Sequence, residues 1–194
     1  MSDNSLDINK ILIAEFEYAK ETATQAMNDR HTLVNYYLII TGVVASAVVG
    51  LLKINFSNNI HSTTSVDITK IPAILLFLLY VVGILYLVQL IRLRQAWIDS
   101  AQAMNKIKDH YFHELKDKQI KNAFKWTSKS LPKPEKLFTI FFLSSLLIII
   151  LDTTAMVSAY VLIKEFNFYI ILNLVIWNIF GQLLSYYYFL SKSK

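Results

Sequence analysis

A single carboxylate, Asp152, lies deep inside a long apolar run of the sequence and is the residue best placed to do chemistry. It follows Lys136 by 16 residues and precedes Lys164 by 12, near the middle of a segment long enough to cross a bilayer. A charge at that depth costs at least ~2.5–3.5 kcal/mol on insertion scales. We therefore expect Asp152 to be hydrogen-bonded by a neighbouring helix, protonated, or facing water.

The next apolar run, 168–190, supplies polar side chains at matching heights. If it pairs in antiparallel with 137–163, residues whose numbers add to about 331 lie at the same level, which predicts that Asn178 lies opposite Asp152. Three roles stay open: a hydrogen bond that only joins two helices, a pore lining or proton relay, and recognition of a substrate or partner protein. The predicted membrane polar site comprises Asp152, Asn178, Thr153, Asn173 and Gln182.

Other candidates for chemistry are weak. His110 and His113 are spaced like one edge of a metal site, but two histidines on an exposed helix are more often solvated. The chain has no cysteine, and its four glycines all lie inside apolar runs, so neither a thiolate site nor a glycine-rich phosphate loop is present. Hydrolase, kinase, metalloprotease and dinucleotide motifs are also missing. We expect no enzymatic activity, no cofactor and no metal.

These residues must be positioned by membrane helices. The chain is 55% hydrophobic over 194 residues, and it contains four apolar runs of about bilayer length. Because a bilayer leaves no water for unpaired backbone groups, we predict an all-α membrane protein of one domain, 1–194, with four transmembrane helices arranged as two hairpins. The expected order is a cytosolic helix 6–34 continuous with transmembrane helix 35–53, outer loop 54–70, transmembrane helix 71–92, cytosolic helix 93–118, basic linker 119–135, and transmembrane helices 136–163 and 168–190.

The orientation follows from the lysines and arginines beside the apolar runs. The segment 92–136 carries eleven cations against five anions, whereas the other loops carry few charges. By the positive-inside rule this segment is cytoplasmic, and so are both termini. The protein is therefore predicted to cross the membrane four times with its N and C termini in the cytoplasm.

The two cytosolic helices are expected to pair as an antiparallel stalk. Apolar residues recur at steps of three and four on both, and a loop centred near residue 62 would place Ala23 beside Ala101. Residues 1–34 have a net charge of −3 and face a basic partner helix. The stalk either helps the bundle to fold or forms a surface that receives a signal.

A basic surface is predicted on the cytosolic side. Lysines interleaved with aromatic residues beside a membrane usually contact anionic headgroups, and the alternative is an anionic or nucleotide ligand. No nucleic-acid module is recognisable, so we expect no nucleic-acid partner. The residues of this signal or lipid surface are Arg92, Arg94, Lys106, Lys108, Lys121, Lys125 and Trp126.

Gly42, Ser46 and Gly50 form a ridge of small residues on the first membrane helix. Small residues four apart let two helix backbones approach closely, which predicts a helix-packing interface. Its partner is either the second membrane helix or another subunit. We expect a homo-oligomer embedded in the lipid bilayer.

The layout resembles that of small multi-span membrane effectors of bacterial nucleotide-signalled antiphage defence systems. The likeness rests on segments of the extended helices and of the membrane boundary: Glu15-Phe16-Glu17-Tyr18-Ala19-Lys20 through Asp29-Arg30, Asn35-Tyr36-Tyr37, and Met104-Asn105-Lys106-Ile107-Lys108. The resemblance implies a quiescent oligomer in the inner membrane. When a cyclic-nucleotide-type signal or its withdrawal acts on its cytosolic helices, such a protein perturbs or permeabilises the membrane and halts growth.

Two functions of other classes compete with this expectation. One is a non-channel scaffold or accessory subunit that stabilises a larger membrane complex. The other is a small ion or solute transporter, which fits less well because the sequence has one isolated carboxylate and no helix pair broken by proline or glycine.

Overall fold

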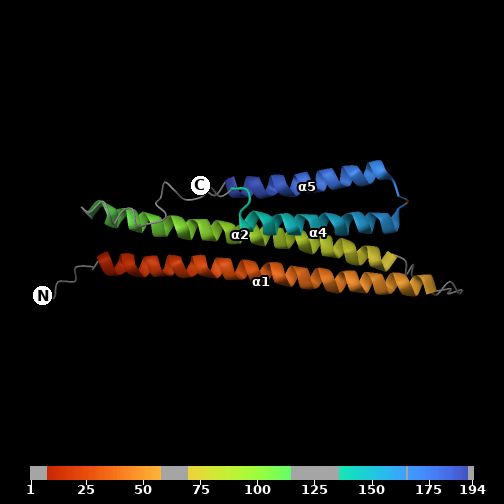
Figure 1. Ribbon diagram of the computed structural model, residues 1–194, viewed down its shortest axis with the longest axis horizontal. Helices are drawn as coiled ribbons and strands as arrows, with labels where there is room; N and C mark the ends of the chain where they lie inside the picture. The colour runs from red at the N-terminus through yellow and green to blue at the C-terminus, as the bar shows by residue number, and fades with distance from the viewer. Residues whose placement is uncertain (1–7, 58–69, 115–135, 165, 192–194) are drawn as a thin grey trace.

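Helices are the only regular secondary structure in the described part of the chain. The computed structural model describes residues 8–57, 70–114, 136–164 and 166–191. Its long helices are α1 (Ile8–Ser57, 50 residues), α2 (Ile71–Glu114, 44 residues), α4 (Ile140–Ile163, 24 residues) and α5 (Phe168–Ser191, 24 residues) (Figure 1). Each is long and apolar enough to cross a membrane. Within these ranges the predicted all-helical fold with four membrane-length helices is confirmed.

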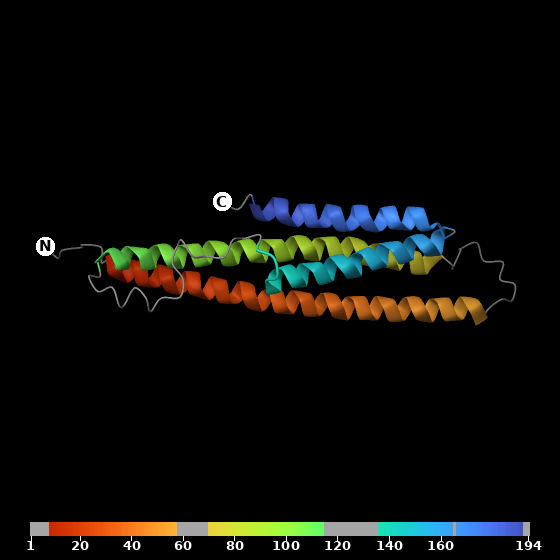
Figure 2. The ribbon, with the colours of Figure 1, turned by 45° about the horizontal axis from the view of Figure 1, so that its top comes forward.

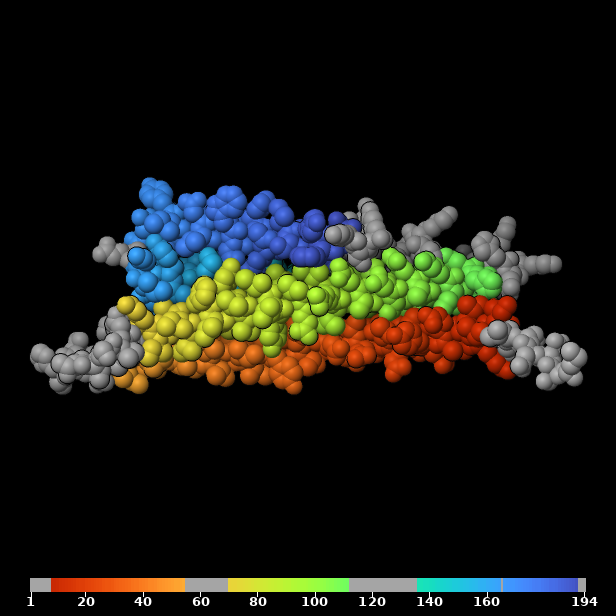
Figure 3. All heavy atoms as spheres, turned by 180° about the vertical axis from the view of Figure 1, so that it is seen from behind, coloured from red at the N-terminus to blue at the C-terminus, as the bar shows by residue number. Residues whose placement is uncertain are grey.

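The helices form an elongated bundle of unequal lengths. α1 and α2 lie side by side and run in opposite directions, and α4 packs against α2 (Figure 1). α5 lies against α4 and α2 on the side away from α1 (Figure 2). At one end α1 and α2 continue well beyond α4 and α5, so that this end consists of two helices (Figure 3).

Alanines form the seam between α1 and α2 at the two-helix end. Ala19, Ala23 and Ala26 on α1 and Ala101 on α2 are all at most 5% exposed. Their small side chains let the two helices approach closely, while the surrounding charged side chains stay outside. Near the end of the pair, Lys108 Nζ lies 5.8 Å from the centre of the Phe16 ring. The alanine seam thus runs along the face predicted from the apolar spacing.

Side chains fix the starts of the two shorter helices. Phe138 adopts a positive φ of 58°, and Thr139 then caps α4 by accepting a hydrogen bond from Phe142 N at 3.2 Å. The helix therefore begins at Ile140, four residues later than the predicted membrane segment. Asn167 Oδ1 accepts hydrogen bonds from the backbone of Tyr169 and Ile170 at the start of α5.

α5 is held by one narrow stripe. Its buried residues are Gln182, Tyr186 and Leu190, which are four apart and lie on one face. In contrast, α4 is buried along most of its length, and its Ile148 and Ile149 are fully enclosed between its neighbours. Most of the surface of α5 is apolar and exposed, as expected for a helix that faces lipid or another protein.

The alanine seam can be tested by overpacking it. Ala23→Leu should lower the free energy of unfolding by about 1–3 kcal/mol, because the added atoms force α1 and α2 apart. Ala14→Leu is the matched control, since Ala14 lies on the same helix and is exposed. Thermal unfolding of the purified protein in detergent measures both. An equal effect of the two substitutions would contradict the packing described.

Candidate functional site

Asp152 is fully buried at the centre of the bundle. It lies on α4, 12 residues after Ile140 and 11 before Ile163, and its exposed fraction is 0%. Gly83 of α2 faces it and leaves the space that the carboxyl group occupies. A Cβ atom at that glycine would lie 2.6 Å from Asp152 Cγ and 2.7 Å from Tyr37 Oη. The carboxyl group therefore fits in the bundle only because α2 has no side chain there.

Two neutral donors from two different helices bind the carboxyl group. Tyr37 Oη of α1 donates to Asp152 Oδ1 at 3.5 Å, and Gln182 Nε2 of α5 donates to Oδ2 at 3.0 Å. Tyr37 is itself fully buried, and its ring packs 5.3 Å from that of Tyr86. Three helices thus hydrogen-bond to one another through this side chain, and a fourth makes room for it. A single hydrogen bond between two membrane helices stabilises a protein by about 0.6–1.7 kcal/mol.

Asn178 reaches Asp152 only through Gln182. Its Oδ1 accepts a hydrogen bond from Gln182 Nε2 at 2.7 Å, and its Nδ2 lies 3.4 Å from Met156 Sδ. The prediction that Asn178 lies directly opposite Asp152 is therefore wrong by about one helical turn. The contacting pairs Asp152–Gln182 and Met156–Asn178 have residue numbers that add to 334, whereas the expected pairing required 331. Side-chain packing therefore shifts the register of α5 along α4 by three residues.

Two further predicted residues do not join this cluster. Thr153 is buried, but its hydroxyl donates to Ile149 O at 2.7 Å within its own helix. Asn173 is exposed, and its amide donates to Tyr169 O at 2.9 Å. Each side chain donates a hydrogen bond to the backbone carbonyl one turn earlier in its own helix, as is common for polar side chains in membrane helices. The structure thus brings together Asp152, Asn178 and Gln182, and it adds Tyr37 and Gly83.

Sequence signals for the two added residues existed. Tyr37 belongs to the apolar stripe that runs through Leu33 into the membrane, so its burial follows from the spacing. Gly83 is the only glycine in α2, and a glycine inside a helix often marks a close approach. Neither the spacing of Tyr37 nor the glycine at position 83 indicates that the side chain packed beside them is the carboxylate of Asp152.

A surface crevice leads to the polar cluster. It lies between α2, α4 and α5, opens on the outside of the bundle, and has a volume of about 450 Å³. Asn178 and Gln182 line it together with Tyr80, Trp177 and Ser185. Gln182 Oε1 is buried and has no hydrogen-bond partner among the described residues. A path of hydrogen-bonding groups therefore runs from the crevice through two amides to the buried carboxyl group, an arrangement that can accept water.

The ridge of small residues faces outward. Gly42, Ser46 and Gly50 are exposed, and a Cβ atom at either glycine would meet nothing within 4 Å. Ser46 donates to Gly42 O at 2.8 Å, which leaves the ridge smooth. Of the two partners considered, the second membrane helix is therefore not the one that packs on it.

The predicted basic surface is divided in the structure. Arg92 and Lys106 are exposed, whereas Lys108 is half-buried over Phe16 and Arg94 is only 4% exposed. Arg94 turns into the bundle beside a second buried arginine, Arg30, which the prediction of this surface did not include. The remaining members, Lys121, Lys125 and Trp126, lie outside the described residues.

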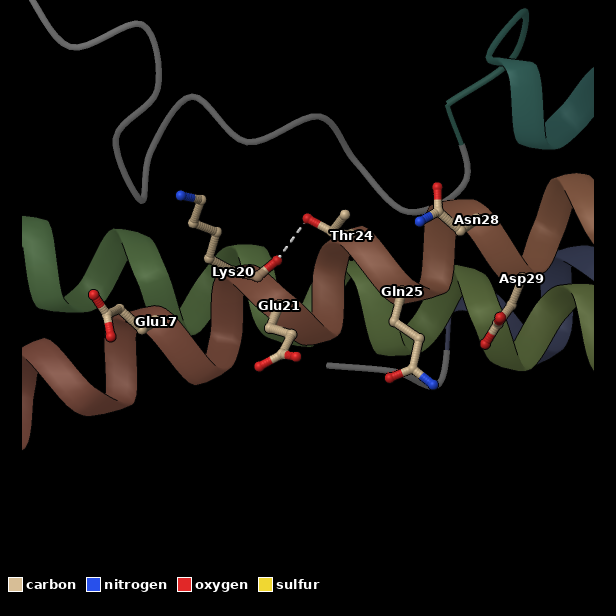
Figure 4. A pocket seen from close by; sticks show the side chains of 7 residues that line it. All are labelled: Glu17, Lys20, Glu21, Thr24, Gln25, Asn28 and Asp29. Carbon is tan, nitrogen blue, oxygen red and sulfur yellow. Dashed lines mark hydrogen bonds between the residues drawn. The ribbon is translucent and has the colours of Figure 1, made fainter.

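A second hollow runs along the outward side of α1. Figure 4 shows the side chains of Glu17, Glu21 and Asp29 on this helix, with Lys20 and Thr24 between them. The one side-chain hydrogen bond drawn there joins Thr24 Oγ1 to Lys20 O, one turn earlier in the same helix. All the charged groups are exposed, and the described residues that line the hollow all belong to α1, which gives this side of the helix the character of a solvated face.

Comparisons with known proteins identify no relative. No protein-family model matches the chain, and no curated protein or solved structure matches it. Within the described ranges, no three His, Cys, Asp or Glu side chains gather closely enough to hold a metal ion. The function must therefore be argued from the polar cluster and the helices that position it.

Gly83→Ala tests whether the cluster is as tightly packed as described. The new methyl group would displace the Asp152 carboxyl group and Tyr37, so we expect a loss of about 1–3 kcal/mol in stability, measured by thermal unfolding in detergent. Gly181→Ala is the control, because a Cβ atom there meets nothing within 4 Å.

The same packing predicts an interaction between two substitutions. Gly83→Ala should cost less in an Asp152→Ala background, because the side chain it collides with is gone. Equal costs in both backgrounds would show that Gly83 does not make room for Asp152.

Proposed function

We propose that this chain is an integral membrane effector that oligomerises in the inner membrane and perturbs or permeabilises it in response to a cytosolic, nucleotide-type signal, as in antiphage defence. The observation that supports the proposal most is the cluster of Asp152, Tyr37 and Gln182. A buried carboxyl group held only by neutral donors is expensive in a bilayer, and such residues usually mark ion or proton paths. The crevice beside Asn178 supplies the access that a polar path needs.

In this proposal the two-helix end of α1 and α2 is a cytosolic stalk. The end carries exposed charged side chains such as Glu17 and Lys106, which suits water and not lipid. The positive-inside rule favours the same orientation, because the basic segment 92–136 belongs to this side. Both termini would then be cytoplasmic, and the four helices would span the membrane as two hairpins.

α1 offers a direct connection between stalk and membrane. It is continuous from Ile8 to Ser57, and it carries both the alanine seam and Tyr37. Ala23 and Tyr37 are 14 residues apart, or about 21 Å at 1.5 Å per residue. A signal that moves the stalk end of α1 against α2 would therefore move Tyr37 against Asp152. To do so, the signal must bind one arrangement of the stalk more tightly than the other.

α5 is the element best suited to move or to be replaced. Only three of its residues are fully buried, on one stripe, and the hydrogen bond of Gln182 to Asp152 is part of that stripe. If α5 separates, the carboxyl group becomes open to the crevice side. The exposed ridge of α1 supplies a second surface through which copies of the chain can associate.

A scaffold without conductance is the second candidate. The broad exposed apolar surface of α5, which includes Trp177, Phe180 and Leu184, would then be covered by a different membrane protein. Such a subunit would copurify stably with its partner and leave vesicles sealed.

Dye release from vesicles tests the permeabilising function. We expect the purified chain to release a small dye from liposomes of anionic lipid when a cyclic nucleotide is added, and we expect Asp152→Leu to reduce release to that of empty vesicles because the polar path is lost. Asn173→Leu is the matched control, since it removes an exposed amide that lies outside the cluster. Unchanged release by a folded, correctly inserted Asp152→Leu protein would reject the pore and favour the scaffold.

The ridge predicts the oligomeric interface. Gly42→Leu combined with Gly50→Leu should lower the oligomeric fraction of the chain, because bulky side chains prevent close backbone approach. Light scattering in detergent after size-exclusion chromatography measures that fraction. Gly181→Leu provides a control at an exposed glycine on another helix. An unchanged fraction in the double variant would place the interface elsewhere.

A further inference from the structure

The crevice between α2, α4 and α5 contains a hydrogen-bond acceptor that the described residues leave unused. Gln182 lines this crevice and is only 8% exposed. Its Nε2 donates both to Asp152 Oδ2 at 3.0 Å and to Asn178 Oδ1 at 2.7 Å, whereas its Oε1 is buried and has no partner among the described residues. An amide oxygen buried without a partner is costly. A ligand in the crevice that donates a hydrogen bond to Oε1 would remove that cost.

The carboxyl group bound to Gln182 favours a ligand with a positive charge. Both of its oxygens accept hydrogen bonds, Oδ1 from Tyr37 and Oδ2 from Gln182, which suits the ionised form of Asp152 because a carboxylate only accepts. Both donors are neutral, so these contacts leave its negative charge unbalanced. Charges attract more strongly in an apolar surrounding than in water. The crevice, one amide side chain away from the carboxylate, therefore has a negative potential.

The positive side chains of the surrounding helices lie at another level of the bundle. α4 and α5 contain no lysine or arginine, and neither does α2 before Arg92. The buried guanidinium groups of Arg30 and Arg94 lie over the ring of Phe141, at 4.8 Å and 5.1 Å from its centre. Phe141 precedes Asp152 by 11 residues on α4, or about 16 Å. Among the described residues, a cation in the crevice would therefore meet the carboxylate without a positive side chain at the same level.

Aromatic rings and depth in the bundle select a ligand with an apolar body. Trp177 and Tyr80 line the crevice, and Trp177 is 70% exposed. The face of such a ring attracts a cation, most strongly where water is excluded. Trp177 follows the start of α5 at Phe168 by nine residues and precedes its end at Ser191 by 14. In the transmembrane arrangement proposed above, the crevice therefore opens among lipid acyl chains, and its volume of about 450 Å³ is that of a small-molecule site.

We propose that this crevice binds a lipophilic organic ammonium ion. The ammonium group donates to Gln182 Oε1 and lies against the ring of Trp177, with the charge of Asp152 behind Gln182, and the apolar body contacts Met156 and Leu174. Because Gln182 belongs to the buried stripe of α5, an occupant would also link α5 to α2 and α4. Occupancy of the crevice does not require passage across the membrane, so the proposal stands apart from permeabilisation.

Three probes of similar shape and different charge test the site. The full chain in neutral detergent is titrated at neutral pH with 1-naphthylmethylammonium, 1-naphthylmethanol or 1-naphthylacetate, and the midpoint of thermal unfolding gives apparent affinities. We expect the ammonium probe to stabilise the protein and to bind about tenfold to a hundredfold more tightly than the alcohol, because only the ammonium brings a positive charge to the carboxylate. The anionic probe should bind least.

Gly181 allows the crevice to be filled without disturbing the fold. It lines the crevice, and a Cβ atom there would meet nothing within 4 Å. Gly181→Leu should therefore abolish stabilisation by the ammonium probe, while the protein without ligand unfolds at its usual temperature. Ala47→Leu adds similar bulk at an exposed position of α1, a helix that contributes no described residue to the crevice, and should leave binding unchanged.

Two further substitutions separate charge from ring contact. Asp152→Asn keeps the size of the side chain and should remove the preference for the ammonium over the alcohol. Trp177→Ala should weaken ammonium binding about tenfold. Phe180→Ala is its matched control, because it removes a ring of the same helix that is 57% exposed and lies outside the crevice lining.

The decisive comparisons need no variant of Asp152, so they hold even if Asp152→Asn does not fold. Equal binding of the ammonium and the alcohol by the unaltered chain would reduce the effect to apolar partitioning and overturn the proposal. A lack of stabilisation by the ammonium probe, or ammonium binding that is unchanged in Gly181→Leu, would overturn it as well.

Discussion

The need to satisfy one carboxyl group inside an apolar bundle governs the arrangement of all four described helices. Asp152 is fully buried, and in the described part of the chain its side-chain hydrogen-bond partners are the neutral groups of Tyr37 and Gln182 on other helices. Tyr37 and Gln182 donate, and Gly83 gives space. These hydrogen bonds only roughly offset the cost of burying the group. Their main effect is on specificity, because a shifted register would leave a buried polar group without partners.

The bundle has two polar layers at different heights. Phe141 and Asp152 on α4 are 11 residues apart, as are Gly83 and Arg94 on α2, and three helical turns separate each pair. Arg30 and Tyr37 on α1 are seven residues apart, about two turns. Each helix thus presents both layers on nearly the same face. Apolar packing fills the space between them, so each layer constrains the register that the other requires.

The sequence predicted the class of fold well and the contacts of the site only in part. Helix type and length follow from the bilayer, which permits few alternatives to runs of about 20 apolar residues. The partner of Asp152 was misplaced by one turn, because numbering from the α4–α5 loop ignores how Met156 and Asn178 pack. Arg30 lies on the predicted apolar stripe, yet its role escaped notice because Phe141, the ring that receives it, is 111 residues away.

The unbroken course of α1 has a consequence for how this protein can vary. Each residue of an α-helix turns the chain by about 100°, so an insertion between Ala26 and Tyr37 would rotate everything after it by that angle. One extra residue would point Tyr37 away from the bundle while leaving the alanine seam in place. Seven would nearly restore the original direction but move Tyr37 two turns along the axis. The spacing of polar and small residues on α1 therefore determines the direction in which each side chain points around the helix axis. The length of this segment is as constrained as its composition.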